Sequence, residues 1–153
     1  MKQKNGITLA MLVITVLIMS ILAATITTSV LTSINNAKLS IWTQEITYVQ
    51  DIMNETTNKE EALLSEITFS VENIDEDVRN EQFKDETIVD NEITLYTVNL
   101  AKIGLDNTVY GKYEKENDIY AYSKATGKVY YLAGMKNSSR EVYYTLTDEL
   151  KNK

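Results

Sequence analysis

A long uncharged segment near the start of the chain most constrains what this chain can fold into. No charged side chain occurs from Asn5 to Ala37, and from Leu9 to Ala24 only Thr15 and Ser20 interrupt the apolar residues. A membrane-spanning helix needs about 20 mostly apolar residues, whereas the core of a cleaved signal peptide needs only about 7–15. The segment therefore predicts a retained transmembrane helix.

The helical pattern continues beyond the uncharged segment. Apolar residues recur at intervals of three and four, at Leu39, Trp42, Ile46, Val49 and Met53. This spacing is typical of an amphipathic helix, and no Gly or Pro interrupts the chain from Ile7 to Met53. We expect one helix from about Thr8 to Met53, roughly 70 Å long. Its five-residue stripe is predicted to pack against a sheet.

The residues at the start of this helix carry a resemblance to a known family. A short basic leader precedes the run Gly6-Ile7-Thr8-Leu9-Ala10-Met11-Leu12-Val13-Ile14-Thr15. This run resembles the prepilin-type N-terminus of type IV pilins and type II secretion pseudopilins, and in particular the pilin-like proteins of Gram-positive, clostridium-type bacteria. The resemblance is strong over about the first third of the chain and weak beyond it.

The resemblance implies a processing site, an assembly helix and a domain. A prepilin peptidase would cut between Gly6 and Ile7 and methylate the amine of Ile7. The implied parts are a leader at 1–6, a transmembrane and assembly helix at 7–34, and an extracytoplasmic domain at 35–153, with the helix continuing to about residue 53. In the assembled helix bundle, the implied contact residues are Leu9, Met11, Leu12 and Ile14.

One position departs from the family pattern. The family usually has a glutamate at the fifth mature residue, where it is thought to pair with the N-terminal amine of a neighbouring subunit, and this chain has Met11 there. Buried charges are costly unless they are paired, so the pair has a clear physical role that Met11 cannot take. A minor or initiating subunit is therefore favoured slightly over a major one.

Charge is distributed unevenly along the chain. Only Lys2 and Lys4 precede the uncharged segment, whereas 13 basic and all 22 acidic residues follow it, a net charge of −9. The positive-inside rule then predicts that this single-pass protein of the cell membrane has its N-terminus in the cytoplasm and its domain outside. The resemblance implies a place at the cell surface, in a pilus or pseudopilus, after assembly. An acidic domain repels nucleic acid, so we expect no nucleic-acid partner for the isolated subunit.

Composition argues against catalysis. The chain has no Cys and no His, which removes thiol chemistry and the commonest general base. No phosphate-binding glycine motif is present. We expect no enzyme, no cofactor and no metal. Nine carboxylates between Glu72 and Glu92 could suit calcium, but the pattern of a calcium loop is absent, and a hydrated acidic surface is favoured.

The remaining residues predict a small antiparallel sheet. Ile67, Phe69 and Val71 alternate as in a strand, and 93–98, 118–123, 128–133 and 142–146 are further predicted strands. The last residues, 148–153, read as a charged tail. The fold class expected is α+β, with the long helix packed on the sheet in a pilin-like arrangement. In the adjacent pairs Tyr130-Tyr131 and Tyr143-Tyr144, we expect one tyrosine inside and one exposed.

These observations leave three functional hypotheses. The leading one is a structural subunit of a type IV pilus or type II secretion-like pseudopilus, whose partners are the membrane, other pilin-like subunits and the prepilin peptidase. The second is an unprocessed single-pass membrane protein with an external binding module. The third, a secreted domain released by signal peptidase, is weakest because the residues near Ala23 and Ala24 make a poor cleavage site.

Overall fold

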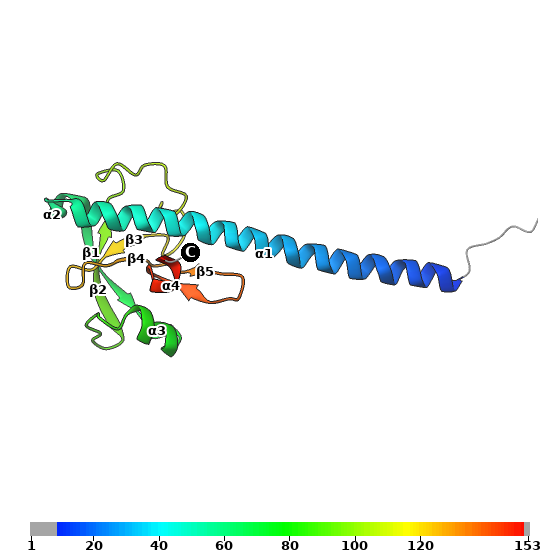
Figure 1. Cartoon of the computed structure of the whole chain (residues 1–153). Coiled ribbons are helices and arrows are strands. Elements are labelled where there is room, and N and C mark those ends of the chain that lie inside the picture. The colour runs from blue at the N-terminus through cyan, green and yellow to red at the C-terminus, as the bar shows by residue number, and fades with distance from the viewer. Residues whose placement is uncertain (1–8, 152–153) are drawn as a thin grey trace, which may run out of the picture.

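The protein has an α+β fold in which a helix packs on a small antiparallel sheet (Figure 1). This computed structural model describes residues 9–151, and in the first helix it describes the side chains of 13–22 and 28–55. The coarse fold class predicted from the sequence is confirmed.

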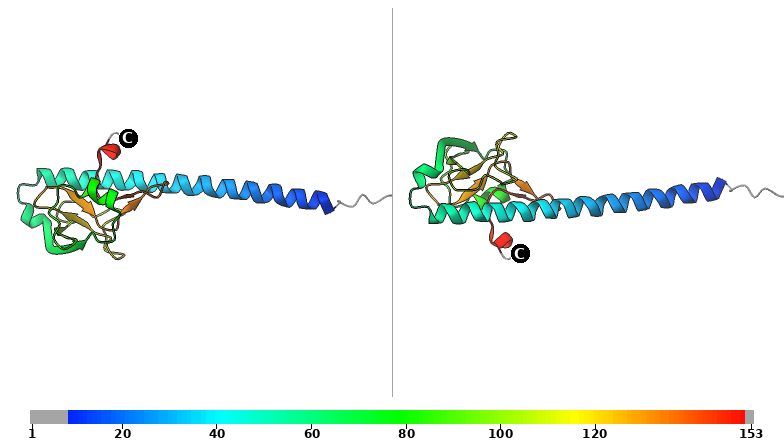
Figure 2. Two further views of the ribbon diagram at one scale, coloured as in Figure 1. Left: turned by 90° about the horizontal axis from the view of Figure 1, so that it is seen from below. Right: turned by 90° about the horizontal axis from the view of Figure 1, so that it is seen from above.

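Helix α1 runs from Leu9 to Glu55, 47 residues in all. Its C-terminal half lies along the domain and its N-terminal half projects beyond it (Figures 1 and 2). The helix ends in a polar cluster. Thr56 donates to the carbonyl oxygen of Ile52 from its backbone nitrogen at 2.8 Å and from its hydroxyl at 2.6 Å.

The main sheet has four antiparallel strands in the order β1-β2-β3-β4. The strands are β1 (Leu63–Ser70), β2 (Glu92–Val98), β3 (Tyr120–Tyr122) and β4 (Val129–Tyr131). The predicted hairpin is present, since β3 and β4 pair with Tyr120 opposite Tyr131, and Gly127 has a φ of +75° in the turn between them. Strand β1 carries a bulge between Leu63 and Glu66.

A second, two-stranded sheet and three short helices complete the fold. Strand β5 (Met135–Lys136) pairs with β6 (Val142–Tyr143). The helices are α2 (Lys59–Ala62), α3 (Glu76–Gln82) and α4 (Asp148–Lys151). The segment predicted as a strand at 142–146 is thus only two residues long and lies outside the main sheet. The segment expected as a charged tail forms α4, because Leu150 is buried.

Both faces of the main sheet are covered. On one face, the α1 side chains Trp42, Ile46, Val49 and Met53 are fully buried, and Leu39 packs partly buried against the same cluster. On the other face, Phe83, which follows α3, stacks on Tyr130 with ring centroids 5.0 Å apart. The residues of β3 and β4 therefore alternate between two apolar cores, whereas β1 and the first half of β2 alternate between the second core and solvent.

This double covering overturns the expectation for the tyrosine pairs. Tyr130 is 0% and Tyr131 is 5% exposed, and they belong to the two opposite cores. Tyr143 is buried and Tyr144 is half-buried in the same way. Adjacent residues do face opposite sides of the strand, but each side carries a core, so neither member of a pair is exposed.

Two glutamine side chains close strand edges. Gln50 of α1 accepts from the backbone nitrogen of Val129 at 2.8 Å and donates to the carbonyl of Gly127 at 2.8 Å. Gln82 of α3 donates to the carbonyl of Val142 at 2.8 Å and accepts from the nitrogen of Tyr144 at 2.6 Å. Each amide supplies one donor and one acceptor, as a neighbouring strand would.

Candidate assembly surface

The residues implied by the resemblance fall largely outside the described part of the chain. The processing residues Gly6 and Ile7 precede residue 9, and the side chains of Leu9, Met11 and Leu12 lie outside the described residues. Of the predicted bundle contacts, Ile14 is described, and its side chain is 55% exposed.

The projecting part of α1 exposes apolar side chains around its whole circumference. Eight large apolar residues at 13–22 are each 49–65% exposed: Val13, Ile14, Val16, Leu17, Ile18, Met19, Ile21 and Leu22. At 100° per residue they point in every direction around the helix axis, and a helix that is apolar all round is normally buried. The domain of the same chain does not reach this segment (Figure 2). Its cover must come from outside the domain.

A narrower apolar ridge continues along α1 into the domain. Ile34, Ile41 and Tyr48 are seven residues apart and 44%, 43% and 63% exposed. Seven residues bring a helix back to almost the same face, so the three side chains form one row. The row lies on a different face from the buried stripe that contains Trp42 and Ile46. The domain half of α1 therefore has one apolar face packed on the sheet and a second one exposed.

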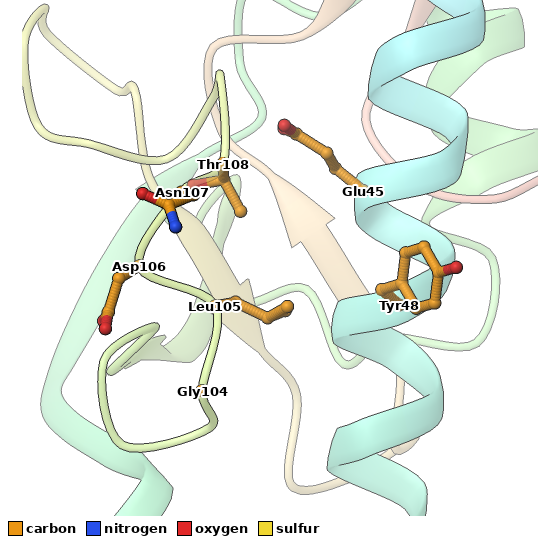
Figure 3. A pocket seen from close by; sticks show the side chains of 7 residues that line it. All are labelled: Glu45, Tyr48, Gly104, Leu105, Asp106, Asn107 and Thr108. Atoms are coloured by element: carbon orange, nitrogen blue, oxygen red, sulfur yellow. The ribbon is translucent and has the colours of Figure 1, made fainter.

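A hollow of about 240 Å³ borders this ridge on one side (Figure 3). Glu45 and Tyr48 of α1 line it opposite the loop 104–108. The Glu45 carboxylate accepts from the backbone nitrogens of Val109 and Tyr110, the latter at 3.1 Å, and from the Tyr120 hydroxyl at 3.4 Å. Glu45 thus ties the loop to α1 and holds the wall of the hollow in place.

Asp118 organises the neighbouring loop. Its carboxylate accepts from the backbone nitrogens of Gly111 at 2.8 Å and Lys112 at 3.1 Å, and from the Tyr131 hydroxyl at 2.9 Å. Burial alone would raise the pKa of Asp118, but these hydrogen bonds and one from Glu114 outweigh it, and the pKa is lowered. Burial and the nearby Asp118 carboxylate raise the pKa of the Tyr131 hydroxyl, which stays protonated as a donor.

A larger hollow of about 740 Å³ borders the ridge on the other side. It lies between α1 and α4, and Tyr48 lines both hollows. In both views of Figure 2, α4 lies on the other side of α1 from the sheet. The exposed Tyr48 ring therefore stands between two depressions, a shape that suits packing against another apolar element.

The acidic segment is only partly a hydrated surface. Asp85 forms an ion pair with Lys128 at 2.6 Å, which lowers the pKa of the Asp85 carboxyl. Glu86 accepts from the hydroxyls of Ser123 and Tyr130, each at 2.8 Å. No group of three or more acidic residues placed to hold a metal ion occurs among the described residues. These two carboxylates fasten the segment to the sheet.

The expected membrane anchor requires a correction. Within the described residues, no helix has the length and hydropathy that crossing a membrane requires. The described apolar run at 13–22 has about half of the roughly 20 residues needed, and from residue 28 onward polar Thr28, Ser29, Thr32 and Ser33 alternate with Val30, Leu31 and Ile34. For this part of the chain, the predictions of a transmembrane helix and of a single-pass location in the cell membrane are wrong.

Comparisons with known proteins add no relative. No protein-family model, no curated protein and no solved structure matches this chain. The descriptions pilin, fimbrium and secretion component therefore receive no support from relatives. The functional argument depends on the surface of α1.

Proposed function

We propose that this chain is a structural, non-catalytic subunit of a filament of the type IV pilus or pseudopilus kind, assembled by packing α1 against the like helices of other subunits, its own copies included. The observation that carries the proposal is the apolar segment 13–22, exposed on all sides. A bundle of like helices supplies apolar neighbours in every direction, which a contact with one flat surface does not.

The energy available to such assembly is substantial. Fully burying a large aliphatic side chain is worth about 1.5–3 kcal/mol, so burying the exposed half of eight of them gives roughly 6–12 kcal/mol per copy. This range overlaps the free energy that corresponds to micromolar association, about 8 kcal/mol. This is a gross gain, from which the translational and rotational freedom lost on association is subtracted.

The ridge on the domain half of α1 supports the same arrangement. Ile34, Ile41 and Tyr48 extend the apolar surface along the helix, and the hollows beside Tyr48 can receive side chains of a neighbour. A seven-residue apolar spacing is typical of helices that pack along their length. The proposed contact therefore continues from the projecting half into the domain.

The proposal includes the processing implied by the resemblance. Cleavage by a prepilin peptidase after Gly6 would give a chain that begins at N-methylated Ile7, and the intact mass of the purified protein tests this directly. With Met11 at the fifth mature position, the subunit is proposed as a minor or initiating one. Quantitative mass spectrometry of sheared filaments tests that role, and an abundance equal to the main component would refute it.

Assembly can be tested with the full chain. The protein is purified in a non-ionic detergent, the detergent is removed by dialysis, and filaments are detected by electron microscopy and sedimentation. Ile14→Lys places a charge in the proposed bundle, where an unpaired charge costs several kcal/mol, and should lower the sedimented fraction at least tenfold. Asn36→Lys, at an exposed polar position of the same helix, is the matched control and should assemble as the parent does.

Two results would contradict the proposal. The parent chain could remain monomeric after detergent removal, as measured by analytical ultracentrifugation. Alternatively, Ile14→Lys could form filaments as readily as Asn36→Lys, which would show that the projecting segment is not in the contact.

A further inference from the structure

Strand β1 has an open edge, whereas side chains and a backbone carbonyl occupy the outer edges of β4 and β6. The outer edge of β4 is occupied by Gln50 and by the carbonyl of Tyr144, which accepts from Tyr131 at 2.6 Å. Gln82 occupies the edge of β6. Strand β1 is the other end of the four-stranded sheet, and in both views of Figure 2 it lies at the margin of the domain.

The hydrogen-bond pattern identifies which backbone groups of β1 are open. Val71 donates to the carbonyl of Asn91 at 2.8 Å, in register with the pairs of β1 and β2. In an antiparallel pair, residues alternate between facing the partner strand and facing away. Glu92 confirms this phase, because its N–H and C=O bond to Val89 rather than to its pair partner Ser70. The outward-facing residues of β1 are Glu66, Thr68 and Ser70. No described residue bonds the outward backbone N–H and C=O groups of these three.

The edge also lacks the usual features that prevent strand pairing. Proteins commonly protect an edge with Lys, Pro, a bulge or an inward-pointing charge. Strand β1 contains no Lys or Pro, and its bulge lies at its start, before Glu66. The Glu66 carboxylate accepts from the Tyr96 hydroxyl of the adjacent strand at 2.6 Å, so it is held over the sheet face.

The surface beside this edge is mainly acidic, and the nearby cation Lys124, which lies over the Tyr96 ring, is paired with Glu60 at 2.8 Å. A hollow of about 320 Å³ lies next to Thr68 and is lined by Glu86, Asp90 and Glu92, with the exposed Val89 at its rim. Glu86 already accepts hydrogen bonds from side chains of the sheet, whereas neither Asp90 nor Glu92 makes an ion pair among the described residues. A strand added to β1 would place alternate side chains on the face that carries this hollow.

We propose that β1 binds an extended, basic peptide segment as a fifth strand of the sheet, with a Lys or Arg side chain directed to the hollow at Asp90 and Glu92. Strand addition uses main-chain hydrogen bonds for affinity and alternate side chains for specificity. The charge of the hollow decides the occupant. A second copy of β1 carries Glu66 and no cation, so it would bring like charge to this surface.

The experiment uses the full chain in detergent and a fluorescent, acetylated eight-residue peptide of alternating lysine and valine. Binding is measured by fluorescence anisotropy, and hydrogen exchange detected by mass spectrometry reports protection over residues 63–71. The same lysine–valine peptide methylated at every backbone nitrogen keeps the charge but lacks the donors of a strand. It should bind about tenfold more weakly or not at all, without protecting β1.

Variants of the protein separate the edge from the charge. Thr68→Pro removes an outward N–H without touching the ladder to β2 and should weaken binding about tenfold, whereas Thr68→Val keeps that N–H and should bind within about twofold of the parent. The double change Asp90→Asn with Glu92→Gln should weaken binding and reduce its dependence on salt.

Three outcomes overturn the proposal. They are equal binding of the unmodified and N-methylated peptides, absence of protection over 63–71 when the unmodified peptide is bound, and equal binding by Thr68→Pro and Thr68→Val. Protection is measured on the unaltered chain, so the proposal can fail even if Thr68→Pro does not fold.

Discussion

Replacing Gln50 with Ala should destabilise the domain by about 2–3 kcal/mol, because Gln50 takes the place of a strand beside β4. Its amide accepts from the nitrogen of Val129 and donates to the carbonyl of Gly127, each at 2.8 Å. Val129 is 1% exposed, so water does not replace the lost acceptor. An unsatisfied buried N–H costs about 1–3 kcal/mol, and a normal hydrogen bond contributes about 1 kcal/mol. The carbonyl of Gly127 is half-buried and contributes the smaller part.

Gln44→Ala provides a matched control for this prediction. Gln44 lies on the same helix, but its side chain is exposed. Both changes replace Gln by Ala, so the difference in helix propensity cancels. Surface substitutions of this kind usually change stability by less than about 0.5 kcal/mol. The difference between the two variants therefore isolates the contact with β4.

Denaturant unfolding of the full chain in detergent measures this difference. Trp42 is the single tryptophan and is fully buried against the sheet, so its fluorescence reports unfolding of this core. Equal midpoints for Gln50→Ala and Gln44→Ala would refute the reasoning. They would mean that Val129 finds another acceptor, or that the edge of β4 carries little of the stability.

Three further predictions test the core and the loops. Trp42→Ala should cost about 3–5 kcal/mol, whereas Trp42→Phe should cost far less, because the indole Nε1 is buried without a hydrogen-bond partner; thermal unfolding followed by circular dichroism compares the two. Because the pKa of the Asp118 carboxyl is lowered, the ionised group stabilises the fold at pH values above its ordinary pKa of 3.8, and this stabilisation is lost as the pH falls through the folded-state pKa. Asp118→Asn should therefore be less stable at pH 7, and its free energy of unfolding should change less in acid than the parent's, as pH-dependent unfolding will show. Tyr113 is exposed and has a φ of +61°, so Tyr113→Gly should relieve backbone strain and leave stability unchanged or raise it by up to about 1 kcal/mol, which the same unfolding measurement checks.

Regular spacing made much of the fold predictable. The residues of the Leu39–Met53 stripe repeat at helical intervals, and they are the residues that α1 packs into the core. The hairpin around Gly127 was predictable because a turn sequence separates two runs of strand-forming residues. In both cases the sequence signal is local. A periodic pattern predicts structure well because each turn of a helix, or each pair of strand residues, shows the same spacing again.

The contacts that position the loops were not predictable from one sequence. Gln50 and Val129 are 79 residues apart, and Glu45 and Tyr110 are 65 apart. A polar residue in a helix is predicted to be exposed unless its hydrogen-bond partner is known, and the sequence around it does not indicate that partner. The prediction for the tyrosine pairs was wrong for a related reason, since Phe83 covers the second face of the sheet only through the tertiary fold.

The two apolar surfaces of α1 are separable, and this separation matters for the proposed assembly. Within the described residues, the stripe packed on the sheet is buried inside one chain, whereas the large apolar side chains of the segment 13–22 and of the ridge at Ile34, Ile41 and Tyr48 are exposed. Changes to the first surface should lower the stability of the domain, and changes to the second should lower association without altering domain unfolding. A filament subunit requires this independence, because its domain must be folded before the copies meet.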